Sequence, residues 1–201
     1  KTGSRDAFRN SGLLLPDGFE NLYTEKEVIE ALGSLRKINP KIRKAVLKLN
    51  EGFSGDGNAV FKYPEGDITA ANFKSNLNIV AGDLDYDSFM GKLNEMGGIV
   101  EAFVEGEIKR SPSVQILINP LNEIEIVSTH DQILGGESGQ VYVGASFPAD
   151  DEYKKDIGAL GYKVAQYLST KGVIGRFAID FVSVKENEAW KHYAIEINLR
   201  K

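Results

Sequence analysis

The sequence of 201 residues contains no cysteine and only two histidines. The absence of cysteine excludes disulfide bonds, thiolate nucleophiles and cysteine-based zinc sites, and two histidines are too few for a histidine-rich metal site. A metal ion in this protein would therefore be held mainly by oxygen atoms.

Long hydrophobic runs are absent as well. No apolar run exceeds three residues, whereas a membrane helix needs about 18 or more. The N-terminal stretch is charged and lacks the apolar region of a signal peptide. We therefore expect a cytoplasmic protein with no membrane partner. The 24 Lys and Arg against 29 Asp and Glu give a net charge of −5, which does not favour nucleic acid as a partner either.

The remaining composition is that of an ordinary folded protein, with 42% hydrophobic and 26% charged residues. The length fits one large domain or two lobes that share a site. The chain begins at Lys1 without a methionine and ends shortly after Asn198. We therefore expect it to be a fragment of a longer protein with further domains.

Hydrophobic periodicity predicts three helices. Thr24 and Glu27 form a capping-box pattern before the first, expected over 25–36. The second is expected over 89–96, before Gly97, and the third over 157–168. Strands are predicted at 45–49, 59–61, 99–104, 114–118, 124–126, 176–184 and 192–198. Together these elements predict an α+β fold with two lobes built on antiparallel sheets and a cleft between them.

Three glycines, Gly52, Gly55 and Gly57, follow the strand that ends near Lys48. Glycines at this density let a backbone approach a phosphate closely, although a plain hairpin turn has the same composition. The segment does not match a P-loop or a dinucleotide fingerprint, and no hydrolase elbow motif is present. Lys48 could reach a phosphate under such a loop.

Oxygen ligands gather near the C-terminus. Glu196 and Asn198 share one face of the last predicted strand, and Asp180 lies among apolar residues of the preceding one. Mg²⁺ prefers such hard oxygen ligands, with nucleotide phosphates filling further positions. The alternative is that all three are ordinary residues of an exposed face. Arg200 continues the same face and could neutralise a transferring phosphoryl group.

Four ordered motifs resemble the ATP-grasp superfamily. They are the Lys1-Thr2-Gly3 opening, the Lys48-Leu-Asn-Glu-Gly-Phe-Ser-Gly-Asp-Gly-Asn loop, the Val100-Glu-Ala-Phe-Val-Glu-Gly-Glu107 hinge and the Glu196-x-Asn198-x-Arg200 metal motif. The resemblance spans essentially the whole chain. It implies an ATP-grasp domain over 1–201, with a small glycine-loop lobe over about 20–100 and a metal-binding lobe over 101–201. Family members also carry a further N-terminal domain, and nothing in this chain corresponds to it.

The resemblance also implies roles for individual residues. Lys1 and Lys48 would contact the ATP phosphates. The loop, with Glu51, Gly52, Ser54, Gly55, Gly57 and Asn58, would fold over the phosphates. Glu101 and the backbone of Phe103 and Val104 would bind adenine, and Glu107 the ribose, with Glu105 as its rival. Asp180, Glu196 and Asn198 would hold Mg²⁺ or Mn²⁺, and Arg200 would stabilise the phosphoryl transition state.

This resemblance implies a ligase that activates a substrate carboxylate as an acyl phosphate for attack by an amine. Its partners would be ATP and a small-molecule or peptide carboxylate with an amine, and some features resemble peptide ligases. The alternatives are a phosphotransferase of the same fold and a nucleotide-binding module that is silent without missing segments. His130 and Arg176 are additional candidates for substrate contacts. We expect His130 to follow a strand at the entry to a glycine-rich loop and Arg176 to precede the Asp180 strand.

Overall fold

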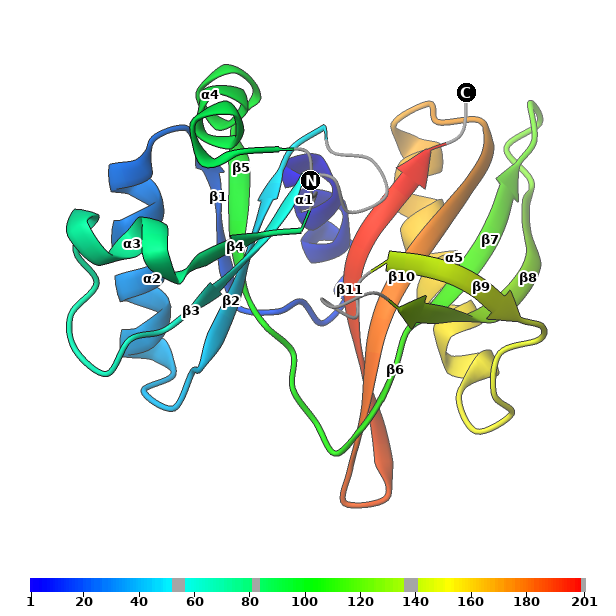
Figure 1. The fold of residues 1–201 in the computed structure, drawn as a ribbon. Coiled ribbons are helices and arrows are strands. Elements are labelled where there is room, and N and C mark those ends of the chain that lie inside the picture. The colour runs from blue at the N-terminus through cyan, green and yellow to red at the C-terminus, as the bar shows by residue number, and fades with distance from the viewer. Residues whose placement is uncertain (52–56, 81–83, 136–140, 200–201) are drawn as a thin grey trace. The chain divides into compact units, whose positions relative to one another are not determined.

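The computed structural model describes residues 1–51, 57–80, 84–135 and 141–199. The chain divides into two compact units (Figure 1). Unit 1 contains residues 1–2 and 16–103, and unit 2 contains residues 3–15 and 104–201. In the described ranges, none of the helices is long and apolar enough to cross a membrane.

Unit 1 is a five-stranded antiparallel sheet with helices packed on one of its faces. The strands run in the order β1-β5-β2-β3-β4. The core joins residues of the helices, such as Val28, Phe73 and Phe89, to Leu47 and Phe61 of the strands. The elements are β1 (Gly18–Leu22), α2 (Glu25–Ile38), β2 (Lys44–Leu49), β3 (Asn58–Lys62), α3 (Ala70–Asn76), β4 (Leu77–Ile79), α4 (Tyr86–Met96) and β5 (Gly98–Ala102).

Unit 2 is built on a six-stranded sheet with the order β11-β10-β7-β8-β9, and β6 also pairs with β10. Helix α5 lies along one face of this sheet (Figure 1). The elements are α1 (Thr2–Asn10, of which Thr2 belongs to unit 1), β6 (Ile108–Arg110), β7 (Pro112–Ile118), β8 (Ile124–Gly135), β9 (Val141–Ser146), α5 (Lys154–Thr170), β10 (Gly175–Glu186) and β11 (Ala189–Leu199).

The core of unit 2 fills the space between α5 and the sheet. Val114, Ile116, Phe177 and Ile179 are all at most 1% exposed and face the helix. Gly161 lets α5 approach closely, because a Cβ atom there would lie 3.1 Å from side-chain atoms of both Val114 and Ile116. Since side chains alternate along a strand, the intervening residues of β7 and β10 lie on the opposite face. We call this second face the open face.

Among the register shifts of the two sheets, the β-bulges in β11 and β8 change which residues of these strands face the core. In β11, Glu196 pairs with Asp180 and Ala194 with Phe181, so Ile195 is skipped. In β8, Ser128 pairs with Gln115 and Ile126 with Ile116, so Val127 is skipped. After each bulge, the alternation of core-facing and outward-facing residues is shifted by one position along the strand.

The predicted elements are confirmed, with one notable change of length. The capping box of Thr24 and Glu27 is present at the start of α2, and Gly97 caps α4. The strand expected at 124–126 continues to Gly135 as β8. Helix α1 and strands β1, β4, β6 and β9, together with α3, were not predicted, because these segments are short or weakly periodic.

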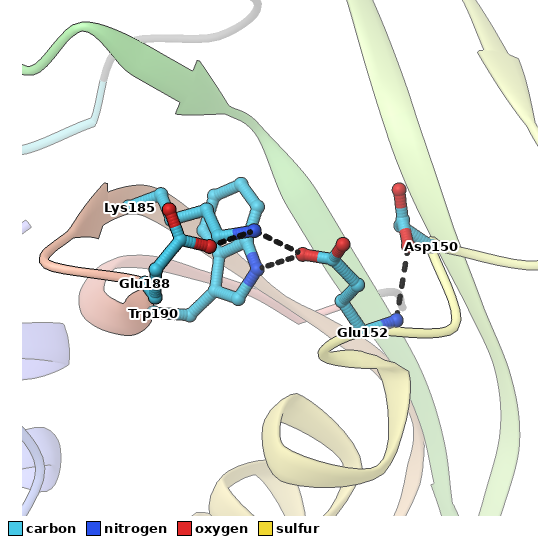
Figure 2. Close-up of polar contacts among 5 residues, drawn as sticks. All are labelled: Asp150, Glu152, Lys185, Glu188 and Trp190. Carbon is cyan, nitrogen blue, oxygen red and sulfur yellow. Dashed lines mark hydrogen bonds and ion pairs between the residues drawn. The ribbon is translucent and has the colours of Figure 1, made fainter.

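A polar cluster joins the β10–β11 hairpin to the segment before α5 (Figure 2). Trp190 Nε1 donates to Glu152 Oε2 at 2.7 Å, and Lys185 Nζ donates to the same oxygen at 3.0 Å. Glu188 lies 3.5 Å from Lys185 Nζ, and Glu152 N donates to Asp150 Oδ1. The hydrogen bond from Trp190, followed by that from Lys185, lowers the pKa of Glu152.

We expect Glu152→Gln to remove part of the pH dependence of stability. A carboxylate with a lowered pKa stabilises the fold above its unfolded-state pKa and loses that contribution as the pH falls through the folded-state pKa. The urea midpoint of the parent should therefore fall more between pH 7 and pH 3 than that of the variant. Equal falls in both proteins would show that this cluster does not stabilise unit 2.

Candidate functional site

Lys48 and Glu101 form a buried ion pair in unit 1. Lys48 Nζ lies 2.6 Å from Glu101 Oε2, and the two side chains are only 9% and 2% exposed. Lys48 pairs with Ile99 and Glu101 with Val46 across β2 and β5, so the two charges meet diagonally on the face opposite the core. A charged side chain that is this buried requires a partner of opposite charge, and Lys48 and Glu101 meet this requirement for each other.

The segment after Lys48 is fixed to the start of the chain. Asn50 Oδ1 accepts hydrogen bonds from the backbone N and the side-chain Oγ1 of Thr2, both at 2.9 Å, and Asn50 O accepts from Lys1 N at 2.9 Å. Leu49 N donates to Gly57 O at 2.8 Å, so strand pairing continues up to the loop. Lys1, Lys48 and the ends of the glycine loop therefore lie in one region of unit 1.

The described part of the glycine loop is limited to its ends. Glu51 is exposed, Gly57 is buried, and Asn58 pairs with Lys48 across β2 and β3. Gly52, Ser54 and Gly55, like Arg200 at the other end of the chain, lie outside the described residues.

The predicted adenine hinge follows β5. The N–H of Phe103 donates to Lys44 O at 3.1 Å and so extends the pairing of β2 with β5. Because this N–H is engaged, the backbone of Val104 is left as the stronger candidate for an adenine contact. Glu105 and Glu107 are both exposed. Glu101, for which we also predict an adenine contact, accepts a hydrogen bond from Lys48 Nζ at 2.6 Å.

The predicted metal ligands lie together on the open face of unit 2. Asp180 and Glu196 are directly opposed across β10 and β11, and such residues have Cα atoms about 5 Å apart. Asn198 Nδ2 donates to Asp180 Oδ2 at 2.7 Å. Ile197, between the two polar residues of β11, packs toward the core. The bulge at Ile195 produces this arrangement, because the buried Ala194 would otherwise share a face with Glu196.

This group fits a hard cation with several positions left for other ligands. Among the residues that the structure describes, no three of the His, Cys, Asp and Glu types gather into a metal-binding cluster. The predicted ligand set consists of two carboxylates, from Asp180 and Glu196, and one amide, from Asn198. Mg²⁺ is commonly held by one or two carboxylates together with substrate phosphates and water, so the residues present suit it.

The open face continues beyond the carboxylates in two rows. Asp180 pairs with Ser113, which pairs with His130 on β8. In the neighbouring row, Asn198 pairs with Ala178, Ala178 with Gln115, and Gln115 with Ser128. The bulge at Val127 places Ser128 and His130 on this face, since Ile126, two residues before Ser128, packs against the core.

The expected position of His130 was wrong. His130 lies inside β8 rather than after a strand, and it is only 7% exposed. Arg176 lies at the start of β10, as the predicted strand over 176–184 implies, and it is exposed and pairs with Leu117. The error for His130 arose because the strand appeared to end at Ile126, where the bulge interrupts the alternation.

Two curated proteins resemble the chain in sequence. The L-propargylglycine--L-glutamate ligase of Streptantibioticus cattleyicolor is 33% identical over 208 residues, which cover 100% of this chain and 40% of that protein. The IQ motif-containing protein H of Danio rerio is 19% identical over 235 residues, covering 99% of this chain and 22% of that protein. The chain thus spans two fifths or less of the length of these relatives.

Solved structures share the fold. Biotin carboxylase from Campylobacter jejuni, solved as a beta-gamma-ATP complex, matches with a TM-score of 0.70 at 16% identity, covering 98% of this chain and 39% of that one. The ADP complex of an N5-carboxyaminoimidazole ribonucleotide synthetase matches with a TM-score of 0.66 at 18% identity, covering 98% of this chain and 43% of that one.

A family model described as IQCH-like, ATP-grasp matches residues 84–200, which is more than half of the chain. This match includes β10 and β11 with Asp180, Glu196 and Asn198. It also agrees with the two antiparallel sheets of the structure. The α+β fold is therefore the ATP-grasp fold, and the chain belongs to the ATP-grasp family.

Proposed function

We propose that this chain is the ATP-binding part of a ligase that activates a carboxylate as an acyl phosphate and transfers it to an amine. The observation that carries the proposal is the group of Asp180, Glu196 and Asn198 on the open face. These oxygens suit MgATP, and the cysteine-free sequence supplies no thiol for covalent catalysis.

Unit 1 contributes the groups that hold the nucleotide. Lys48 presents its charge to the phosphates, and Glu101 fixes the position of Lys48 through the 2.6 Å contact. Lys1 provides a second positive charge, and the Glu51 to Asn58 loop covers the phosphates. The first residues of unit 2 after β5 complete the nucleotide contacts: Val104 contacts adenine through its backbone, and Glu107, with Glu105 as the alternative, binds the ribose.

Unit 2 contributes the charge balance for phosphoryl transfer. Asp180, Glu196 and Asn198 would hold Mg²⁺, which would supply charge neutralisation on the phosphate oxygens. Arg200 stabilises the charge that develops on the transferring group. An oxygen of the substrate carboxylate attacks the γ-phosphorus of ATP, and the bond to ADP breaks. The amine nitrogen then attacks the acyl carbon, and inorganic phosphate leaves as the amine loses a proton.

The substrates that we propose are amino acids. The name of the relative that is 33% identical describes the joining of L-propargylglycine to L-glutamate. An amino acid carries both the carboxylate and the amine that this chemistry requires. L-Glutamate is therefore the first acid to test, followed by the other amino acids.

Trapping of the acyl phosphate tests the proposal. The intact protein, given MgATP, hydroxylamine and each amino acid in turn, should release ADP and form a hydroxamate only with its substrate acid. ADP release without hydroxamate, together with a phosphorylated product, would show a phosphotransferase instead. Saturable MgATP binding in calorimetry with no turnover on any acid would show a silent nucleotide-binding module.

A further inference from the structure

The open face of unit 2 carries a second polar group away from the carboxylates. His130 lies in the same row as Asp180, with Ser113 between them. Two strand spacings separate their backbones, which is about 10 Å. This distance leaves room for a phosphoryl group and an acyl group between a cation at Asp180 and a ligand at His130.

His130 has an unsatisfied ring nitrogen. The ring is 7% exposed, and among the described residues its Nδ1 is the buried side-chain nitrogen or oxygen that has no hydrogen-bond partner. Leaving such a group unpaired normally destabilises a fold. An apolar residue at this position of β8 would avoid that cost. A ligand that completes the hydrogen bond explains the residue.

The surroundings of His130 favour the uncharged ring. Burial lowers the pKa of the imidazole, and this effect outweighs the opposing influence of Asp131. Asp131 belongs to the other face, where it accepts from Tyr153 OH at 2.6 Å. The two open-face rows, from Glu196 to His130 and from Asn198 to Ser128, contain no Lys or Arg, and Arg176 lies on this face in the next row beyond Ala178, farther from His130.

These features select an amine over a carboxylate at this end of the face. A carboxylate would require a cation or several N–H donors, whereas an uncharged imidazole can accept a hydrogen bond from an amine. Gln115 and Ser128 in the adjacent row add neutral hydrogen-bonding groups. Phe147 stacks on the imidazole with the ring centroids 4.7 Å apart and is itself 64% exposed, so a single exposed side chain covers this side of the ring.

We infer that His130, with Gln115 and Ser128 beside it, binds the nitrogen of the amine substrate on the open face of unit 2. This inference rests on the proposed ligase function and adds the position of its second substrate. His130 is thereby the residue that holds the nucleophile, while Asp180 and Glu196 serve the nucleotide end of the same face.

Hydroxylamine is a suitable amine probe because it also traps the acyl phosphate. We expect His130→Ala in the intact protein to raise the KM for hydroxylamine at least tenfold and to leave the KM for ATP within twofold of the parent. His130→Asn, which keeps a hydrogen-bonding side chain, should recover part of the loss. An unchanged KM for hydroxylamine in His130→Ala would overturn the inference.

His192→Asn is the matched control. His192 is the other histidine of the chain, and its Nδ1 already lies 2.7 Å from Ser183 Oγ. We expect this variant to keep the parent's KM for hydroxylamine. A further readout separates binding from folding: His130→Leu removes the unsatisfied nitrogen, so its melting temperature should equal or exceed that of the parent while its KM rises. A lower melting temperature would assign His130 to the packing of the fold.

Histidine NMR distinguishes failure of this inference from failure of the proposed function. With only two histidines, hydroxylamine titrated into the protein with MgATP should shift the ring signals of His130 and leave those of His192 in place. If the parent forms no hydroxamate, the ligase proposal fails, and the titration alone then decides whether the amine site exists. Ring signals of His130 that do not move would overturn the inference.

Discussion

Lys48→Met is expected to abolish measurable MgATP binding and to destabilise the protein by about 3–5 kcal/mol. The substitution leaves the carboxylate of Glu101, which is 2% exposed, without the lysine 2.6 Å away. A buried carboxylate that loses a cation at this distance is destabilised, because burial has removed its hydration. The same change removes the ammonium group that we assign to the phosphates. Calorimetry with MgATP and urea unfolding at pH 7 measure the two effects.

A double variant separates binding from stability. Lys48→Met with Glu101→Leu replaces the whole ion pair by apolar groups, which is often neutral or stabilising. We expect it to regain most of the lost stability and to remain unable to bind MgATP. Recovery of MgATP binding in the double variant would contradict the role of Lys48, since binding would then depend only on the integrity of β2 and β5.

Glu196→Gln should lower turnover by roughly 100-fold or more. Charge neutralisation by a metal ion stabilises phosphoryl transition states by several kcal/mol, and each 1.4 kcal/mol is a factor of ten in rate. The variant keeps the shape of the side chain opposite Asp180 but removes one of the two negative charges. We therefore also expect a higher Mg²⁺ concentration for half-maximal activity. Hydroxamate formation across an Mg²⁺ titration measures both changes.

Glu186→Gln is the matched control for this variant. Glu186 ends β10 in the same sheet, and its exposed carboxylate lies 2.6 Å from Lys191 Nζ. The same chemical change at this distant position should leave the Mg²⁺ dependence as in the parent. If both variants lost activity equally, the effect would come from overall charge and not from a metal site at Asp180 and Glu196.

Local sequence signals were sufficient for the longer elements of the fold. Thr24 and Glu27 predicted the start of α2 because a capping box depends only on residues three apart. The periodic apolar residues of α5 and the alternation in β7 likewise reflect burial on one face. Helix α1 was not predicted because its nine residues include only two apolar ones, Ala7 and Phe8. Two adjacent apolar residues do not define a hydrophobic period.

The contacts of the site depended on information that local patterns do not contain. Lys48 and Glu101 are 53 positions apart and meet only because β2 and β5 are neighbours in a particular register. The resemblance assigned both residues to the nucleotide but did not indicate that they form an ion pair with each other. His130 was misplaced for a related reason, since its position on the face depends on a bulge that its own sequence does not announce.

At the skipped residues Val127 and Ile195, the inward-facing and outward-facing positions of β8 and β11 exchange. Ile126 and Ala194, on one side of each bulge, face the core, whereas His130 and Glu196, on the other side, lie on the open face. Hydrophobic packing and chemistry therefore draw on separate sets of positions within the same strand. A substitution on the core side of β8 or β11 therefore need not alter the side chains that we assign to the nucleotide and the substrates.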